Sequence, residues 1–208
     1  MPGFKTEGII LRRRDFGEAD RILTVFTLSK GKLSIVAKGV RRITSRRAGN
    51  VELLNRVVLY LYQGKGMPIL TEAESIQTFP KLKTDLTLST VAYHIIELVD
   101  KLTAENQESR ILYEHLVQVL KRLERKPRQI LIRTFEAKIL SLMGFVNFQL
   151  DTSDVSSKLQ ELERSSWDEI EELIINEKQA MELERILRYH LEKVIEGSLK
   201  SRRFLKNL

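Results

Sequence analysis

The sequence predicts an α+β chain of two domains, a small β-barrel followed by an all-α helical bundle. Two observations carry this prediction. Turn residues separate short apolar stretches up to about residue 80, and apolar residues recur with a helical period after Pro80. A third observation is the charge, because residues 1–80 have a net charge of +7 and residues 81–208 a net charge of zero. We therefore place the domains at 1–80 and 81–208.

The barrel is predicted from five stretches rich in β-branched and aromatic residues. The alternation of "RILTVFTL" and the composition of "RVVLYLY" are typical of strands, and "DFGEAD", "SKGK" and "QGKGM" are typical of turns. One connection, after the third strand, is longer than the others. Five strands in about 75 residues fit the OB-fold, a barrel that often binds oligonucleotides. The predicted strands are 6–14, 21–28, 33–40, 56–62 and 68–75.

The helices are predicted from apolar stripes at helical spacing and from end signals. Ser166 to Glu169 has the spacing of a capping box, Pro127 suits a first helical turn, and Gly144 and Gly197 are typical of helix ends. We expect the stretch 145–165 to be irregular. The predicted helices are 85–104, 108–125, 128–143, 169–176 and 179–196.

The densest positive charge lies directly after the third predicted strand, in a stretch without any acid from residue 21 to 51. A loop that only reverses the chain needs no cations, so the charge indicates an anionic partner, with nucleic acid first. Arg12 and Arg14 share one face of the first strand and could join this surface, although nearby acids could pair with them. The candidate contacts in the loop are Lys38, Arg41, Arg42, Arg46 and Arg47.

Tyr60 and Tyr62 share one face of the fourth predicted strand. Aromatic faces beside cations can stack with the bases of single strands. The alternative is that both are ordinary half-buried barrel residues, and the sequence favours it.

Further basic residues lie on the predicted helices, next to an acidic block at 151–184 with a net charge of −8. These cations could pair with the acidic block, contact nucleic acid, or bind an acidic peptide, and the sequence does not choose between these roles. The residues of this secondary basic surface are Lys121, Arg122, Arg125, Arg128, Arg185, Arg188, Arg202 and Arg203.

Signs of catalysis or of a bound metal are missing from the sequence. There is no cysteine, no phosphate-binding glycine motif, and no spacing of the three histidines that suits a metal. His94, His115 and His190 are expected to be ordinary helix residues, and the acids at 168–172 fit a helix start better than a metal site. We predict a protein that is not an enzyme and holds no cofactor or metal. No apolar run is long enough to span a membrane, and the sequence predicts a cytoplasmic location.

Three stretches carry a resemblance to the RecO family of bacterial recombination mediators. They are "TEGIILRRRDFGEADRILTVFTLSKGKLSIVAKGVRRITSRRAG", "FEAKILSLMGF" and "LKSRRFL". The resemblance implies an N-terminal OB-fold, a helical C-terminal domain, and binding and annealing of single- and double-stranded DNA. It implies work with RecR to load RecA onto strands coated by single-strand-binding protein, whose tail is a further partner, and a place near the bacterial nucleoid. The matched loop motif implies DNA contacts by Lys38, Arg41, Arg42 and Arg46.

Many family members carry a four-cysteine zinc module after the "GF" of the second stretch. This chain has no cysteine there, so the resemblance implies no zinc for it. Two other functions stay open from the residues alone: an RNA-binding OB protein, and a protein–protein adaptor with an incidental basic loop.

Overall fold

The computed structural model describes residues 3–148 and 154–195 and divides into two compact units. The barrel unit combines Met1–Pro80 with Thr103–Glu114. The helical unit combines Lys81–Leu102 with His115–Leu208. The chain therefore leaves the barrel unit, makes a short helix and a longer one, and returns to it before completing the helical unit.

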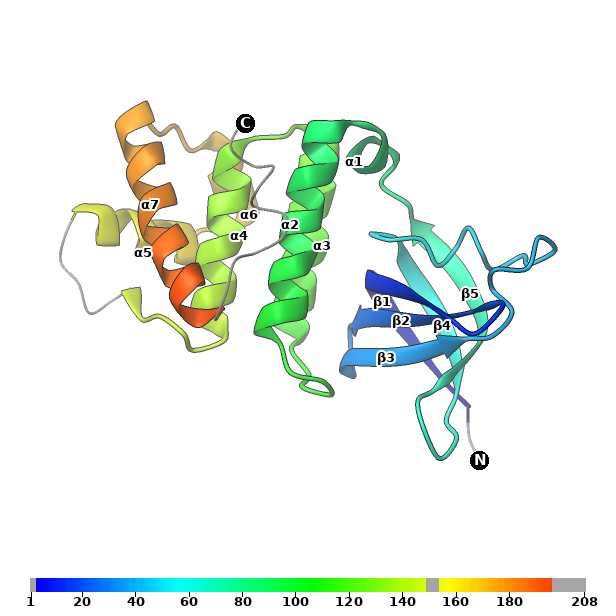
Figure 1. Cartoon of the computed structure of the whole chain (residues 1–208). Coiled ribbons are helices and arrows are strands. Elements are labelled where there is room, and N and C mark those ends of the chain that lie inside the picture. Colours follow the sequence, from blue (N-terminus) through cyan, green and yellow to red (C-terminus); the bar gives the residue numbers. More distant parts are fainter. Residues whose placement is uncertain (1–2, 149–153, 196–208) are drawn as a thin grey trace. The chain divides into compact units, whose positions relative to one another are not determined.

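Five strands form a closed barrel in the order β1-β2-β3-β5-β4 (Figure 1). The long β1 pairs antiparallel with β4 through its first half and with β2 through its second half, with an irregularity between Ile10 and Arg12. A parallel bridge from Val36 to Ile69 joins β3 to β5 and closes the barrel. This confirms the predicted OB-type barrel followed by helices. The strands are β1 (Gly3–Phe16), β2 (Asp20–Thr27), β3 (Gly31–Ala37), β4 (Arg56–Tyr62) and β5 (Ile69–Gln77).

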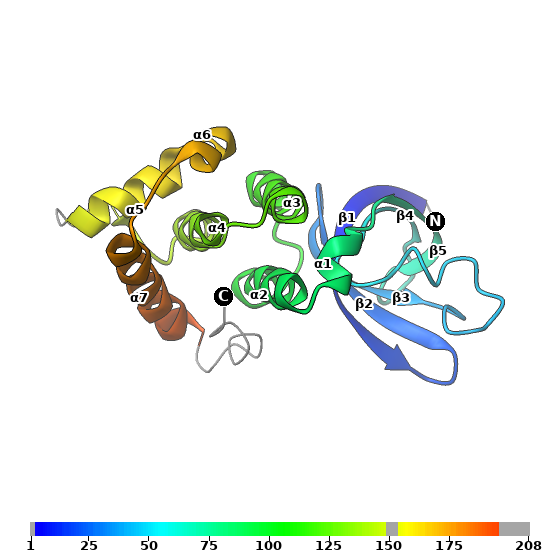
Figure 2. The same cartoon turned by 90° about the horizontal axis from the view of Figure 1, so that it is seen from above.

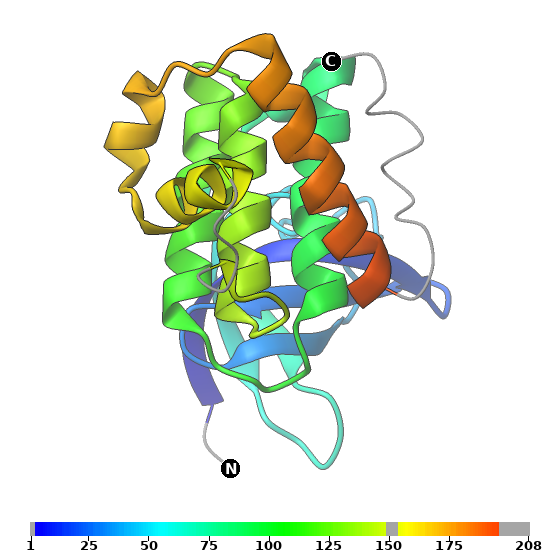
Figure 3. The ribbon, with the colours of Figure 1, turned by 90° about the vertical axis from the view of Figure 1, so that its left-hand side faces the viewer.

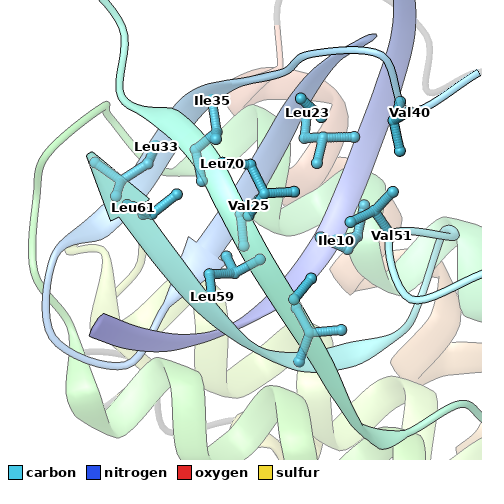
Figure 4. Packing of buried hydrophobic residues seen from close by; sticks show 13 residues of the cluster. Ile10, Leu23, Val25, Leu33, Ile35, Val40, Val51, Leu59, Leu61 and Leu70 are labelled. Carbon is cyan, nitrogen blue, oxygen red and sulfur yellow. The ribbon is translucent and has the colours of Figure 1, made fainter. Parts of the chain in front are cut away.

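The barrel core is filled by alternate residues of all five strands and by two residues of the loop after β3 (Figure 4). Val40 and Val51 are fully buried at one end of this core, and Leu33 and Leu61 lie at the opposite end. A buried aliphatic side chain of this kind contributes roughly 1.5–3 kcal/mol. The loop is thus part of the folded core, although it carries the densest charge.

Residues 103–114 are built into the barrel unit by specific contacts. Lys32 is buried and its Nζ donates to Thr103 O at 2.7 Å, while Asn106 N donates to Lys32 O at 2.9 Å. Tyr113 OH donates to Glu7 Oε1 at 2.7 Å, and burial together with this carboxylate raises the pKa of Tyr113. The segment 103–114 therefore completes the predicted 1–80 domain.

The helical unit is organised around α4. This helix packs against α2, α5, α6 and α7, and Figures 2 and 3 show it in the middle, with α2 and α3 on one side and α5 and α7 on the other. In the described parts of the chain, the helices are α1 (Pro80–Thr84), α2 (Leu86–Leu102), α3 (Arg110–Arg125), α4 (Gln129–Leu142), α5 (Asp154–Arg164), α6 (Trp167–Glu172) and α7 (Glu177–Val194).

Buried polar groups of α4 connect it to its neighbours. Glu136 is 1% exposed and contacts His94 Nε2 of α2 at 2.7 Å and Arg133 at 2.8 Å, and Arg133 also reaches Glu184 of α7 at 3.2 Å. Burial raises the pKa of Glu136, but Arg133 and the His94 hydrogen bond outweigh burial and lower it to about 2. Lys138 donates to the carbonyls of Glu163 and Ser165, at the end of α5. The "FEAK" stretch thus stabilises the packing of this unit.

Several predicted boundaries are wrong. The helix predicted at 85–104 is α2, and a short helix that the sequence did not predict, α1, precedes it. The third strand ends at Ala37, because Gly39 adopts a left-handed φ of 64° and turns the chain. The helix predicted at 169–176 ends at Glu172, and the stretch expected to be irregular, 145–165, contains α5. The capping box at Ser166 is confirmed, as is the stop at Gly144, whose φ is 73°. The stop predicted at Gly197 lies outside the described residues.

Among the described residues, no helix is long and apolar enough to cross a membrane.

Gly31 should tolerate no side chain. Its φ is 65°, and a Cβ there would lie 2.2 Å from Gln107 O in the segment 103–114. Gly31→Ala is expected to lower the free energy of unfolding by roughly 3 kcal/mol or more, because the cost of the strained φ is added to the cost of the backbone clash. Gly17→Ala is the matched control, because Gly17 has a φ of 57° and open space around its Cβ position. Urea unfolding checks this, and equal losses in both variants would contradict the close packing of 103–114.

The helical unit should lose stability in acid through Glu136. Its pKa is about 2 in the folded chain against an ordinary 4.5, so its stabilising effect is complete above pH 4.5 and is lost as the pH falls towards 2. Glu136→Gln should cost roughly 3 kcal/mol at pH 7 and flatten this acid dependence. Thermal unfolding between pH 7 and 2 measures both effects. Glu161→Gln, which removes an exposed partner of Lys158, should leave the pH profile unchanged.

Candidate nucleic-acid interface

The loop of residues 38–55 between β3 and β4, called the basic loop below, is held by contacts at both of its ends. Gly39 N donates to Asp20 Oδ1 at 2.6 Å, and Arg41 N donates to Ala19 O at 2.9 Å. Further along, Asn50 Nδ2 donates to Ala73 O of β5 at 2.7 Å. With Val40 and Val51 in the core, these bonds fix the positions from which the cationic side chains project.

Arg47 has a structural role in the basic loop. Its guanidinium donates to Leu70 O at 2.8 Å, to Thr71 O at 3.3 Å and to Lys38 O at 2.8 Å. These carbonyls belong to β5 and to the first residue of the loop. Arg47 therefore ties the loop to the barrel edge, and most of its donors are used inside the protein.

Lys38, Arg42 and Arg46 are the available cations of the basic loop. All three are exposed, and their side chains form no hydrogen bond or ion pair within the described part of the chain. They surround a shallow cleft of about 580 Å³ that Thr44 and Ser45 also line. Ser45 Oγ is buried and has no hydrogen-bond partner among the described residues.

One acid also lines the cleft. Asp20 lies beside the three cations, but its carboxylate already accepts the hydrogen bond from Gly39 N. The cleft is therefore electropositive overall, and its hydroxyls and cations match the oxygens of a phosphate group.

The remaining predicted cations of the barrel unit are Arg41, Arg12 and Arg14. Arg41 lies 3.4 Å from Asp15 and donates to Gly17 O at 3.4 Å, so its charge is partly neutralised. Arg12 and Arg14 are exposed, as their common face predicts. Sequence reasoning did not foresee that Arg13, between them, turns to Glu52 of the basic loop. Only a contact between distant parts of the chain reveals this pair.

The two tyrosines occupy the outer face of β4, on which the alternate residues Leu59 and Leu61 do not lie because they are buried in the core. Lys5 Nζ lies 4.9 Å from the centre of the Tyr60 ring, and Glu72 of β5 is the cross-strand neighbour of Tyr60. Tyr62 is 42% exposed. One face of Tyr60 is thus already used, which leaves Tyr62 as the more open aromatic surface.

The secondary basic surface is largely engaged in ion pairs with the acidic block. Arg122 contacts Asp168 and Glu171, Arg125 contacts Glu171 at 2.5 Å, and Arg188 contacts Glu184 at 2.5 Å. Arg128 donates to the carbonyls of Glu171 and Leu173. Lys121 and Arg185 are exposed and have no partner in the described ranges, while Arg202 and Arg203 lie outside them. The structure thus favours pairing with the acidic block, which the sequence left open, for Arg122, Arg125 and Arg188, while Arg128 binds backbone carbonyls.

The three histidines lie in helices, as the sequence predicts, and two of them form contacts between helices. His94 is buried against Glu136, and His115 Nδ1 accepts a hydrogen bond from Trp167 Nε1 at 3.0 Å. Their roles are packing contacts between helices, which the spacing of residues along the chain cannot reveal. The described residues contain no group of three histidine, cysteine or acidic residues that could hold a metal.

Comparison with known proteins gives consistent matches along most of the chain. The family model described as "Recombination protein O N terminal" matches residues 1–79, and "Recombination protein O C terminal" matches residues 83–151. The chain is similar to the "DNA repair protein RecO" of Desulforudis audaxviator, with 38% identity over 70% of this chain and 58% of the relative. The protein of the same name from Acetivibrio thermocellus is 38% identical over 70% of this chain and 59% of the relative. The matches thus span less than two thirds of these curated relatives.

Loss of the Arg47 side chain should destabilise the barrel unit. Arg47→Ala removes a charged donor from three backbone carbonyls and should lower the free energy of unfolding by about 2–3 kcal/mol. Arg46→Ala removes the same charge from the neighbouring residue, which has no such bonds, and should stay within about 0.5 kcal/mol of the unchanged chain. Urea unfolding followed by circular dichroism distinguishes them. Similar values for the two variants would show that the Arg47 bonds contribute little.

Proposed function

The chain belongs to the RecO family of DNA repair proteins, and from this premise we propose that it is a non-enzymatic mediator that binds DNA through the basic loop. The observation that carries the proposal is the cleft in which Lys38, Arg42 and Arg46 are exposed and unpaired within the described residues. Unpaired cations on a fixed loop can contact successive phosphates without first breaking internal ion pairs.

We propose that both single- and double-stranded DNA are ligands and that complementary strands anneal on this surface. Phosphate contacts position a strand without reading its sequence, and they leave base edges free. Cations between two strands also screen the repulsion of their phosphates. These two effects together lower the barrier to pairing. Arg12, Arg14 and Tyr62 are exposed on the same unit and extend the proposed surface.

The partner assignments follow from family membership. We propose that the chain works with RecR to help load RecA onto strands coated by single-strand-binding protein, and that the tail of that protein is bound. Within the secondary basic surface, Lys121 and Arg185 are the exposed cations without a partner in the described ranges, so they are our candidates for contacts with an acidic tail. This part of the proposal is independent of the basic loop.

The DNA proposal is tested by binding a fluorescent single-stranded oligonucleotide over a series of salt concentrations. Each phosphate contact on a single strand contributes about −0.7 to the slope of log affinity against log salt. The double substitution Arg42→Ala and Arg46→Ala should weaken binding and make the slope shallower by roughly 1.4. The loop should stay folded, because the core valines and Arg47 are untouched.

The matched control is Lys121→Ala with Arg185→Ala, which removes the same charge from exposed positions of the helical unit. Its slope should equal that of the unchanged chain. If both double variants behave alike, the basic loop is not the phosphate site. Tighter binding of a matched RNA oligonucleotide would favour an RNA-binding role, and undetectable nucleic-acid binding by the unchanged chain would favour a protein adaptor.

A further inference from the structure

We propose that a second cavity of the barrel unit binds a single unpaired guanine base. The cavity has a volume of about 640 Å³ and lies between the start of β1, the start of β3, the β4–β5 loop and residues 105–106. Its wall residue Leu33 lies at the opposite end of the core from Val40 and Val51 (Figure 4). The cavity is therefore distinct from the cleft of the basic loop, and the inference rests on the proposed function because it takes nucleic acid as the ligand.

One wall of the cavity is apolar and suits the flat face of a base. Phe4, Leu33, Met67 and Pro68 line it. Phe4 is half-buried and packs against the barrel core, so its ring is held in place, and Met67 is 42% exposed. An aromatic ring of this kind provides a stacking surface for a base, and a thioether beside it adapts to the shape of a flat ligand.

A carboxylate at the cavity is held in position. Ser34 Oγ donates to Glu105 Oε1 at 2.7 Å, and the backbone of Glu105 forms a parallel bridge with Lys32. The next residue, Asn106, has a left-handed φ of 59° and donates its N–H to Lys32 O at 2.9 Å. Glu105 thus comes from the segment 103–114 and is fixed by contacts to β3. Its second oxygen remains available as an acceptor.

The other polar groups add acceptors and one cation. Gln63 Nε2 donates to Gly64 O at 3.2 Å and to Gly66 O at 3.1 Å, which leaves its Oε1 free to accept. Lys30 is exposed at the cavity, and its ammonium group has no partner in the described ranges. The cavity therefore suits a flat ligand with N–H donors on one edge and an anionic group nearby, as in a nucleotide.

Guanine fits this set better than the other bases. Its Watson–Crick edge has two adjacent donors, N1–H and the exocyclic amine, and a carboxylate can accept from both. Adenine and cytosine have an amine beside an acceptor nitrogen, and thymine has one N–H between two carbonyl oxygens. A carboxylate repels these acceptors. Glu105 thus favours guanine by attraction and disfavours thymine by repulsion.

The cavity is within reach of the basic loop. Ser34 and Lys38 are four residues apart along β3 and its end, a separation of about 13 Å at the rise of a strand. A few nucleotides of single strand can span this distance. A strand whose phosphates lie at the basic loop could therefore place one base in the cavity.

The test uses the full chain labelled with ¹⁵N and titrated with dGMP, dTMP and deoxyribose 5-phosphate. We expect dGMP to shift the amide signals of Ser34, Gln63 and Glu105, dTMP to bind roughly tenfold more weakly, and the sugar phosphate to give no shifts. Glu105→Gln should reduce the preference for dGMP to about twofold or less. The matched control, Glu72→Gln, changes an exposed carboxylate of β5 that does not line the cavity, and it should keep the preference.

Four results would overturn the inference. Equal shifts with the sugar phosphate would make Lys30 a simple anion site. Equal affinity for dGMP and dTMP, or a preference for dGMP that survives Glu105→Gln, would exclude recognition of the guanine base by Glu105. The absence of cavity shifts, together with oligonucleotide binding that depends on Arg42 and Arg46, would reject the guanine site alone and leave the proposed function intact. Phe4→Leu keeps an apolar side chain but removes the aromatic ring. It should weaken the binding of every nucleotide without changing the order of their affinities.

Discussion

Burial of Val40 and Val51 in one end of the barrel is the constraint on which the candidate interface depends. The barrel needs apolar side chains to fill that end, and the basic loop supplies them. A loop that contributes to a core cannot move freely, so its cations are held at defined positions. Like charges repel when they are held close together, and this cost is offset by the buried valines, the carbonyls around Arg47 and the hydrogen bond from Gly39 to Asp20. The fold thereby stabilises a concentration of charge that a free loop would disperse.

The same residue type performs opposite tasks on neighbouring positions. Arg46 projects into the cleft, whereas Arg47 donates hydrogen bonds to backbone carbonyls. In the helical unit, Arg122 and Arg128 hold α6 against α3 and the start of α4. Net charge therefore overstates the surface available to an anion, and only the pattern of partners separates structural arginines from available ones.

Sequence reasoning was strongest where the signal is local. The strand predicted at 21–28, the capping box at Ser166 and the left-handed Gly144 each depend on a few neighbouring residues, and the structure confirms them. It was weakest where distant residues decide. The pairing of Arg13 with Glu52, the burial of His94 against Glu136 and the formation of α5 all depend on contacts between separate parts of the chain. For the candidate site, the location of the charge could be predicted, but the division between available and committed cations could not.

The return of residues 103–114 to the barrel has a consequence for the order of synthesis. During translation, all five strands are synthesised before this segment. The hydrogen bonds of Lys32 with Thr103 and of Glu7 with Tyr113 can therefore form only after the segment has emerged. The helices α1 and α2, which begin the other unit, are made within that interval. The barrel unit and the helical unit therefore cannot fold strictly one after the other. A nascent chain stopped near residue 80 would have a barrel that lacks the contacts of residues 103–114.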